Sequence, residues 1–392
     1  MESAVMKYFF KIFLSELQKV FRNHDILLMV LGAPILYGVV LSFAYTQGRV
    51  ENVPVAVVAQ DSSAFTQNLL RQIDATEEVA LTDSFTTIPE ATHAIKNGDN
   101  VALLYVPKNF TKRRLRLQAS PLYLATNTSN FALSNPAMVG TATVTQTFGA
   151  GTLMALMRKT GQTKEKAFNL ASPIALDTRQ IFNPLLNYSF FFVPGLIYAI
   201  LQQIILVGLC FSLTEEKDRR VWQPPQSFGM VAPYIVGRCL PYALINLLFS
   251  LAYIYILLPW IHLNVSYTQL GLITVFGFAF VFASSAMAFL FGLLFKDSVT
   301  AIVALMFYSM PAFLISGMSW PSFNLSLPLK ILSWFTPITH FGEAIRRILL
   351  EPEVGFQHVL TSFLNTLLFA IVVVGVCIWI LVRNKADQTK LT

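Results

Sequence analysis

Side chains suited to acid–base or metal chemistry are few in this chain and lie far apart. Its five histidines show none of the spacings typical of metal ligands; they are His24, His93, His262, His340 and His358. His340 stands three residues before Glu343, with Arg346 and Arg347 beyond, so a helix would bring them together. A hydrogen-bonded helix end explains that group better than catalysis, because no Ser-His-Asp pattern or carboxylate pair accompanies it. We therefore predict no catalytic, cofactor-binding or metal-ligating residues.

The composition is that of a membrane protein. Of the 392 residues, 55% are hydrophobic and 12% are charged, whereas soluble proteins are about 25% charged. The net charge of +7 could suggest nucleic acid, but Lys and Arg cluster at the ends of apolar stretches, as membrane orientation requires. We expect contact with the lipid bilayer and no nucleic-acid partner. The three cysteines lie in separate apolar stretches, so no disulfide framework is predicted.

Six apolar stretches are long enough to cross a membrane, since a helix needs about 20 residues to span the hydrocarbon core. Short loops on one side carry Lys and Arg, including Lys19 and Arg22 before the first stretch, whereas residues 260–267 have neither. Both termini are therefore predicted to be cytoplasmic, in a bacterial inner membrane. The six stretches cover residues 26–45, 188–213, 231–259, 270–295, 299–317 and 360–382.

Two features leave room for other topologies. Residues 136–157 are uncharged and could just span, but their Thr, Gly and Ala content, with Gln146 in the middle, favours a buried helix of a soluble domain. A seventh span would also put the later basic loops on the wrong side. Residues 42–44 resemble a signal-peptide cleavage site, although the long charged leader favours an uncleaved anchor.

The pattern as a whole predicts a polytopic α-helical membrane protein with six transmembrane helices and an inserted extracytoplasmic α/β domain. Residues 1–25 are expected to form a cytoplasmic amphipathic helix on the membrane surface. Residues 48–186 alternate strands and helices, beginning with the Val-rich strand 53–61, and form the periplasmic α/β domain. The remaining segments are the first transmembrane helix (26–47), the second to fifth transmembrane helices with a cytoplasmic loop at 214–230 (187–318), outer-leaflet re-entrant or interfacial helices (319–358), and the sixth transmembrane helix with a cytoplasmic tail (359–392).

The spans argue against a proton-coupled pump and favour an external energy source. No Asp or Glu lies well inside any of the six, whereas ion-coupled carriers usually hold acids or bases there. The chain also lacks the GxxxxGK[ST] motif of phosphate-binding loops. We therefore expect no enzyme acting alone.

Three stretches resemble type 2 ABC exporter permeases, particularly the bacterial branch with a large periplasmic domain after the first span. Residues 182–196 resemble that branch's entry into the second span, and residues 315–350 resemble the family's signature. The residues that match are Asn183-Pro184, Asn187, Pro194-Gly195, Ser316-Gly317, Pro321, Thr336-Pro337 and Arg346-Arg347.

The third stretch is the cytoplasmic loop. Residues 213–227 resemble the family's acidic coupling segment, with Glu216 and Lys217 at its Glu-Lys/Arg pair. Arg219 and Arg220 stand where the family commonly has Gly-Thr, which puts the details of coupling in doubt. Together the three stretches extend the resemblance over essentially the whole chain.

The resemblance implies a half-transporter that pairs with a second copy or a paralogue and with an ATP-binding-cassette ATPase. The ATPase subunit would bind ATP and Mg, so no cofactor is expected in this chain, and a periplasmic membrane-fusion adaptor is a further candidate partner. ATPase coupling is assigned to Glu215, Glu216, Lys217 and Arg219. The cargo would be small amphipathic or lipid-like compounds, moved out of the cytoplasm or inner membrane along a path lined by Phe190, Phe191, Phe192, Met306, Phe307, Met310 and Phe313.

Two other functions fit the same spans. The chain could anchor a periplasmic scaffold or receptor without transport, or it could be a channel or secondary carrier. The amphipathic leader and the cytoplasmic loop favour the exporter, because a mere anchor needs neither. A basic group in the inserted domain is interpreted as a solvated face, with lipid headgroups or a periplasmic partner as alternatives; it comprises Lys108, Lys112, Arg113, Arg114 and Arg116.

Overall fold

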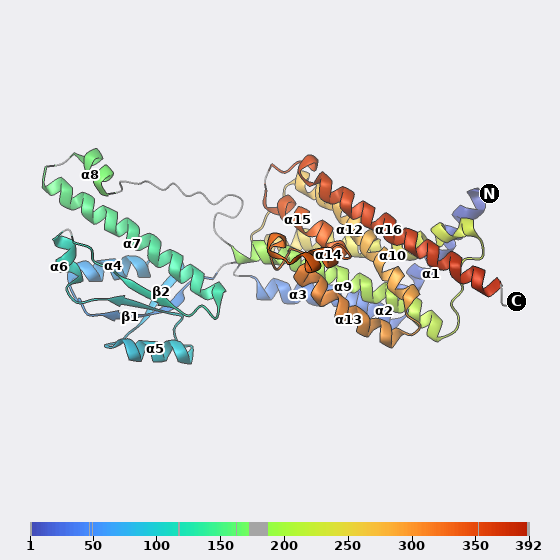
Figure 1. Cartoon of the computed structure of the whole chain (residues 1–392), viewed down its shortest axis with the longest axis horizontal. Coiled ribbons are helices and arrows are strands. Elements are labelled where there is room, and N and C mark those ends of the chain that lie inside the picture. The colour runs from blue at the N-terminus through green and yellow to red at the C-terminus, as the bar shows by residue number, and fades with distance from the viewer. Residues whose placement is uncertain are drawn as a thin grey trace. The chain divides into compact units, whose positions relative to one another are not determined.

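The computed structural model describes residues 2–46, 48, 50–116, 118–161, 163–171, 187–351 and 353–389. The chain divides into two compact units (Figure 1). The helical unit comprises Met1–Gly48 and Gln180–Thr392, and the sheet unit comprises Arg49–Arg179. The motif residues Asn183 and Pro184 lie outside the described residues.

Six helical segments of the helical unit are long and apolar enough to cross a membrane, which confirms the predicted number for the described residues. The first α-helix and the last have their outer ends at the same end of the bundle (Figure 1). The helices that build these segments are α2 (His24–Leu27), η1 (Leu28–Gly32) and α3 (Ala33–Ala44); α9 (Tyr188–Asp218); η2 (Phe228–Met230), α10 (Val231–Ala252), η3 (Tyr253–Leu257) and α11 (Leu258–Trp260); α12 (Tyr267–Leu294); α13 (Ser298–Ile315); and α16 (Phe356–Thr389).

The core of the helical unit forms around α12. This helix packs against α9, α10 and α16, and apart from Gln269 its buried residues are apolar or small. Phe276, Phe280 and Phe289 are fully buried, and Phe280 stacks on Phe341 with ring centroids 4.4 Å apart. By contrast, α3 and α13 are largely exposed within the chain. Because exposed apolar spans must meet lipid or another subunit, the sides formed by α3, α13 and the similarly exposed α16 are open to lipid or partners.

The N-terminal helix α1 (Glu2–Arg22) is amphipathic, as its spacing predicts. It packs on α10, where Ile12 lies against Gly237; a Cβ added to this glycine would be 3.1 Å from the Ile12 side chain. Asn23 separates α1 from α2, because its Oδ1 accepts from the backbone N–H groups of Asp25 and Ile26 and caps the new helix. This break lets α1 follow its own direction before the first span begins.

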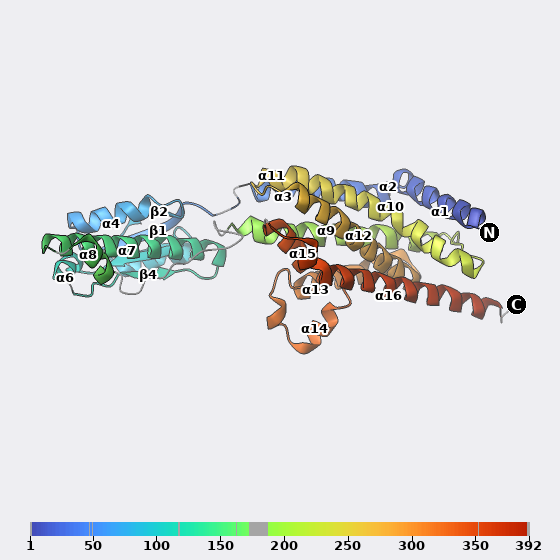
Figure 2. The same cartoon turned by 90° about the horizontal axis from the view of Figure 1, so that it is seen from above.

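Two short helices connect α13 to α16, and each is too short to span a bilayer. They are α14 (Leu327–Ser333), which follows the short turn η4 (Ser322–Asn324), and α15 (Pro337–Leu350). Figure 2 shows α14 standing away from the other helices of this unit. By contrast, α15 is held in the core by Phe341 and Ile345, both fully buried.

The sheet unit contains a four-stranded sheet in the order β2-β1-β3-β4. β1 pairs with β2 and with β3 in parallel, and β3 pairs with β4 antiparallel. Parallel neighbours require crossover connections, and helices supply them. The strands are β1 (Val53–Ala59), β2 (Val79–Ser84), β3 (Ala102–Val106) and β4 (Tyr123–Thr126); the helices are α4 (Ala64–Asp74), α5 (Ile88–Asn97), α6 (Phe110–Leu115), α7 (Phe131–Lys159) and α8 (Lys164–Ala171).

Both faces of the sheet are covered, which explains the nearly continuous apolar sequence of β1. Val53 and Val55 contact the core shared with α4 and α7, whereas Ala56 and Val58 contact the core shared with α5. The uncharged stretch 136–157 belongs to α7, and the sheet covers only its first turns. The part of α7 that is buried is therefore shorter than predicted.

The basic group of the sheet unit is only partly a solvated face. Lys112 and Arg113 are exposed on α6, but Arg114 is half-buried. Its guanidinium donates to the carbonyl oxygen of Gly149 and to Thr152 Oγ1, both on α7. Nearby, Asp61 accepts from the backbone N–H groups of Ser63 and Thr111; partial burial opposes the shift, but these hydrogen bonds hold the pKa of Asp61 below its usual value.

Candidate functional site

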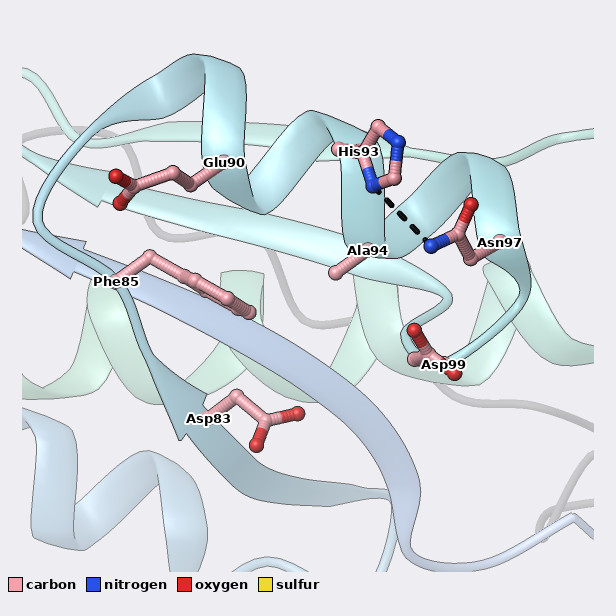
Figure 3. A pocket seen from close by; sticks show the side chains of 7 residues that line it. All are labelled: Asp83, Phe85, Glu90, His93, Ala94, Asn97 and Asp99. Atoms are coloured by element: carbon pink, nitrogen blue, oxygen red, sulfur yellow. Dashed lines mark hydrogen bonds between the residues drawn. The ribbon is translucent and has the colours of Figure 1, made fainter.

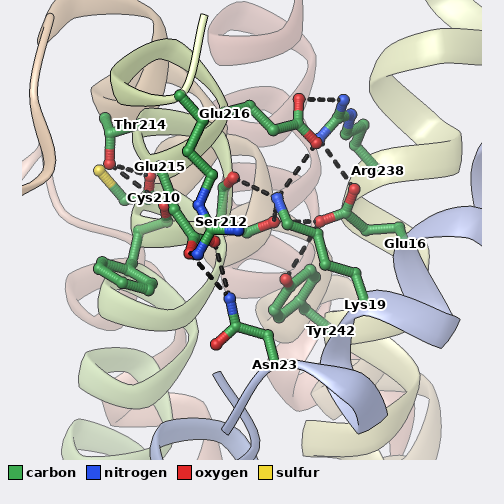
Figure 4. A network of polar contacts seen from close by, with 12 residues as sticks. Glu16, Lys19, Asn23, Cys210, Ser212, Thr214, Glu215, Glu216, Arg238 and Tyr242 are labelled. Atoms are coloured by element: carbon green, nitrogen blue, oxygen red, sulfur yellow. Dashed lines mark hydrogen bonds and ion pairs between the residues drawn. The ribbon is translucent and has the colours of Figure 1, made fainter. Parts of the chain in front are cut away.

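Glu216 lies in the last turn of α9 at the centre of an ion-pair network (Figure 4). Its two carboxylate oxygens accept from both terminal nitrogens of Arg238 on α10, at 2.8 and 2.6 Å. Arg238 also donates to Glu16 of α1 at 2.8 Å, and Lys19 of α1 lies 3.1 Å from Glu216. The network thus joins three helices with two carboxylates and two cations, so the charges balance where water is largely excluded.

Glu16 is 3% exposed, and neutral groups complete its hydrogen bonding. Its Oε1 accepts from the hydroxyl groups of Ser212 on α9 and of Tyr242 on α10, the latter at 3.1 Å. Lys19 in turn donates to Ser212 Oγ at 2.8 Å. A buried carboxylate with a cation and two hydroxyl donors is satisfied, so it fixes the position of α1 on the bundle.

Glu215 forms a second connection between α1 and α9. Both of its oxygens accept from Asn23 Nδ2, at 3.0 and 2.8 Å. On its other side, Arg219 Nη2 lies 2.7 Å from Glu215 Oε1, while the Arg219 side chain remains 70% exposed. Asn23, which follows the last residue of α1, is therefore held by α9. Of Asn23, Glu215 and Arg219, it is Arg219 that faces solvent.

Lys217 and Asp218 bind the turn between α12 and α13. The Asp218 carboxylate accepts from the backbone N–H and the hydroxyl of Ser298, the first residue of α13. The negative charge of Asp218 at the start of α13 and the positive charge of Lys217 at the end of α12 complement the dipoles of these two helices. The Lys217 ammonium donates at 2.7 to 3.0 Å to three carbonyl oxygens at the end of α12, those of Gly292, Leu293 and Phe295.

The coupling segment differs from the loop that was predicted. α9 continues to Asp218, so Glu215, Glu216 and Lys217 lie on a helix, and the loop begins only at Arg219. The helix persists because its last turn is anchored by ion pairs and hydrogen bonds on three sides. All four predicted coupling residues form ion pairs or hydrogen bonds within the chain, and Arg219 is the one whose side chain remains largely exposed.

A polar groove of about 640 Å³ lies beside this network, between α1 and the end of α9. Its floor includes Glu215 and Glu216, and its rim includes Arg22 and Arg219. The exposed side chain of Val221 borders the same groove. A surface with both charges and an apolar edge suits a protein partner rather than a small molecule.

The predicted path residues fall into two groups, one on α9 and one on α13, and these two helices pack against each other. On α9, Phe191 lies under the Arg346 guanidinium at 4.5 Å, and Phe192 lies beside Tyr45 with ring centroids 6.3 Å apart. Phe190 and Phe313 are half-buried against the core. On α13, three side chains are exposed, with relative exposures of 62%, 78% and 63% for Met306, Phe307 and Met310.

The sheet unit has an open hollow of about 560 Å³ along α5. Figure 3 shows the carboxylates of Asp83, Glu90 and Asp99 around the opening, with the Phe85 ring between the first two. His93 is bound to Asn97 of the same helix at 3.1 Å. Within the described residues, no group of three or more His, Cys, Asp or Glu side chains could hold a metal ion.

Two central residues of the network, Glu16 and Arg238, were not predicted as site residues. Arg238 lies inside the predicted span 231–259, and a charge at that depth requires a partner. Glu16 is the one acidic residue of the stretch 5–22. A lone cation inside a span and a lone carboxylate in the leader could therefore have been predicted to form an ion pair.

The six long apolar helical segments define a multi-pass membrane protein. The family profile of ABC-2 family transporter proteins matches residues 25–383, and the chain belongs to that family. It is similar to the probable multidrug ABC transporter permease YbhR of Escherichia coli strain K12, with 24% identity over 338 residues, covering 82% of this chain and 84% of that protein. The protein of the same name from Escherichia coli O157:H7 matches equally.

Proposed function

We propose that this chain is the membrane-spanning subunit of an ATP-driven exporter, and that a separate ATPase subunit binds the groove between α1 and α9. The observation that carries the proposal is the network around Glu216. It connects the wall of the groove to α10 directly, and Lys217 and Asp218 connect the same helix end to α12 and α13. A movement of the end of α9, caused by the ATPase, would therefore be transmitted to α10, α12 and α13.

The proposed orientation puts the groove and both termini in the cytoplasm of a bacterium and the sheet unit in the periplasm. Basic residues support it, because Arg22, Arg219 and Lys296 all flank the same ends of spans. An ATPase is cytoplasmic, so this orientation also places the groove within its reach. ATP and Mg would be bound by that partner.

We propose that the cargo is a small amphipathic or lipid-like compound and that it moves between two copies of this chain, or between this chain and a paralogue. The exposed side chains Met306, Phe307 and Met310 support this path, since Met and Phe adapt to varied apolar guests. The description of the relatives as multidrug permeases agrees with such a cargo. A periplasmic adaptor is a further proposed partner of the sheet unit.

Reversing the charge of Arg219 tests the groove. Arg219→Glu would repel a partner's acidic group and the neighbouring Glu215, so we expect roughly tenfold weaker association with the ATPase, or about 1.4 kcal/mol. The measurement is ATP hydrolysis by the complex purified from membranes through this chain, at several protein concentrations.

Lys296→Glu is the matched control, because Lys296 is exposed in the α12–α13 turn but does not line the groove. It makes the same change of charge and should leave association intact. Equal association for Arg219→Glu and the unmodified chain would count against an ATPase in this groove.

A further inference from the structure

A second hollow, with a volume of about 430 Å³, opens on the flank of the helical unit. Its walls are α12, α16 and the corner that leads from α14 into α15. The volume lies in the range of about 300 to 1,000 Å³ found for ligand pockets. It shares no lining residue with the polar groove or with the exposed face of α13. Any ligand held here is therefore independent of the proposed ATPase contact.

The hollow contains no charged side chain. Its most polar wall residue, His340, is 9% exposed and uses Nε2 in a 2.9 Å hydrogen bond to the carbonyl oxygen of Trp334. The imidazole ring also packs edge-on against Trp334 and beside Phe369, with ring centroids 5.7 and 5.5 Å away. Burial lowers the pKa of His340, which favours the neutral ring. The walls thus favour a neutral, apolar guest.

Asn365 of α16 is the second polar residue of the lining. It is half-buried, and its amide makes no hydrogen bond to any other residue that the structure describes. An amide among apolar side chains gains free energy when it finds a partner. Water is a poor occupant of the hollow. A buried water needs about two to four polar partners, and the lining offers few polar groups besides Asn365.

The hollow opens sideways. The side chains at its rim are exposed and apolar, with relative exposures of 59% for Trp334, 58% for Leu368 and 55% for Val372. Both α12 and α16 belong to segments long enough to span a membrane. An exposed apolar rim of this kind suits contact with lipid, so a guest could enter from the bilayer.

We propose that this hollow binds an ester-linked acyl chain of a bilayer lipid, with the Asn365 amide donating to the ester carbonyl. The apolar walls hold the hydrocarbon, and the lack of charge leaves the headgroup outside. Asn365 supplies the donor that an ester oxygen, but not a plain hydrocarbon, can use.

Photo-crosslinking tests this site in the full-length protein, reconstituted in vesicles that contain a phosphatidylcholine with a diazirine on its acyl chain. Peptide mapping should place crosslinks on hollow residues such as Met287 and Phe369. Leu290→Trp fills the hollow from the α12 side and should reduce that labelling at least fivefold. Leu294→Trp is the control, since Leu294 is 60% exposed one turn further along α12 and does not line the hollow.

Undiminished labelling of the hollow in Leu290→Trp, or labelling spread evenly over the exposed faces of α16, would overturn the site. Leu368→Trp fills the hollow from α16 and repeats the test if Leu290→Trp fails to fold. A second comparison uses ester- and ether-linked probes. The unmodified protein should prefer the ester several-fold and Asn365→Leu should show no preference; an equal preference in both proteins would overturn the role of Asn365.

Discussion

Glu216 and Glu16 each connect the same three helices, α1, α9 and α10. Glu216 accepts a bidentate pair of hydrogen bonds from Arg238 and contacts Lys19, while Nη1 of Arg238 also donates to Glu16. Buried ion pairs add little net stability, because desolvation offsets most of their attraction, yet breaking one is costly. The network therefore specifies how α1, α9 and α10 fit together more than it stabilises the fold.

Glu216→Gln is predicted to separate assembly from transport. The amide keeps the shape and can accept from one nitrogen of Arg238, but it removes the charge that holds Arg238 and Lys19 together. We expect normal insertion, a loss of stability smaller than the roughly 3–5 kcal/mol of a broken buried pair, and continued ATP hydrolysis with strongly reduced export. Insertion is checked by membrane fractionation, and export by cargo efflux relative to ATP consumed. Export at the normal ratio would contradict a coupling role.

At the scale of elements, Met318 anchors the turn between α13 and α14 to the core. Met318 inserts between α9 and α15, where Gly195 and Gly342 leave room for it. The carbonyl oxygen of Met318 also accepts from Arg346 of α15 at 2.8 Å. The turn is thus tied to the core at one point, while α14 beyond it stands away from the bundle (Figure 2).

Gly342→Ala is predicted to disturb the packing of Met318. A Cβ at Gly342 would lie 2.5 Å from Met318 Sδ, so the methionine side chain must move and lose part of its packing between α9 and α15. We expect a loss of about 1–3 kcal/mol, as for other overpacked cores, seen as a lower unfolding temperature of the purified protein.

Gly375→Ala provides the comparison, because a Cβ there meets nothing within 4 Å. That change should leave the unfolding temperature equal or slightly higher, since alanine restricts the unfolded chain more than glycine does. Equal behaviour of the two variants would show that Met318 does not fill the space beside Gly342.

At the scale of the whole molecule, α13 presents a face that its own chain leaves uncovered. Val303 and Leu314 extend the exposed row formed by Met306, Phe307 and Met310. The row follows one side of the helix, as a contact surface does. Under the proposed function this side meets the second subunit.

Single cysteines at Met306, Phe307 and Met310 test that arrangement in native membranes. The three natural cysteines are buried, which keeps background labelling low. At least one of the three positions should give a covalent dimer with a short thiol-reactive crosslinker. Val372→Cys, which is 55% exposed on α16, should remain a monomer. Dimer bands of equal strength from α16 and α13 would indicate random collision instead of a defined interface.

The sequence by itself determined the six spans, the amphipathic leader and the strand–helix alternation, because each depends on local spacing of apolar residues. It also pointed to Glu216 and Lys217 through family resemblance. Only the tertiary structure decided what these side chains do. Residue 16 lies about 200 positions or more from residues 216 and 238, and the pairing of the three depends on how α1, α9 and α10 pack. The extension of α9 to Asp218 has the same cause, since Lys217 and Asp218 are held by the α12–α13 turn, about 75 to 80 residues away.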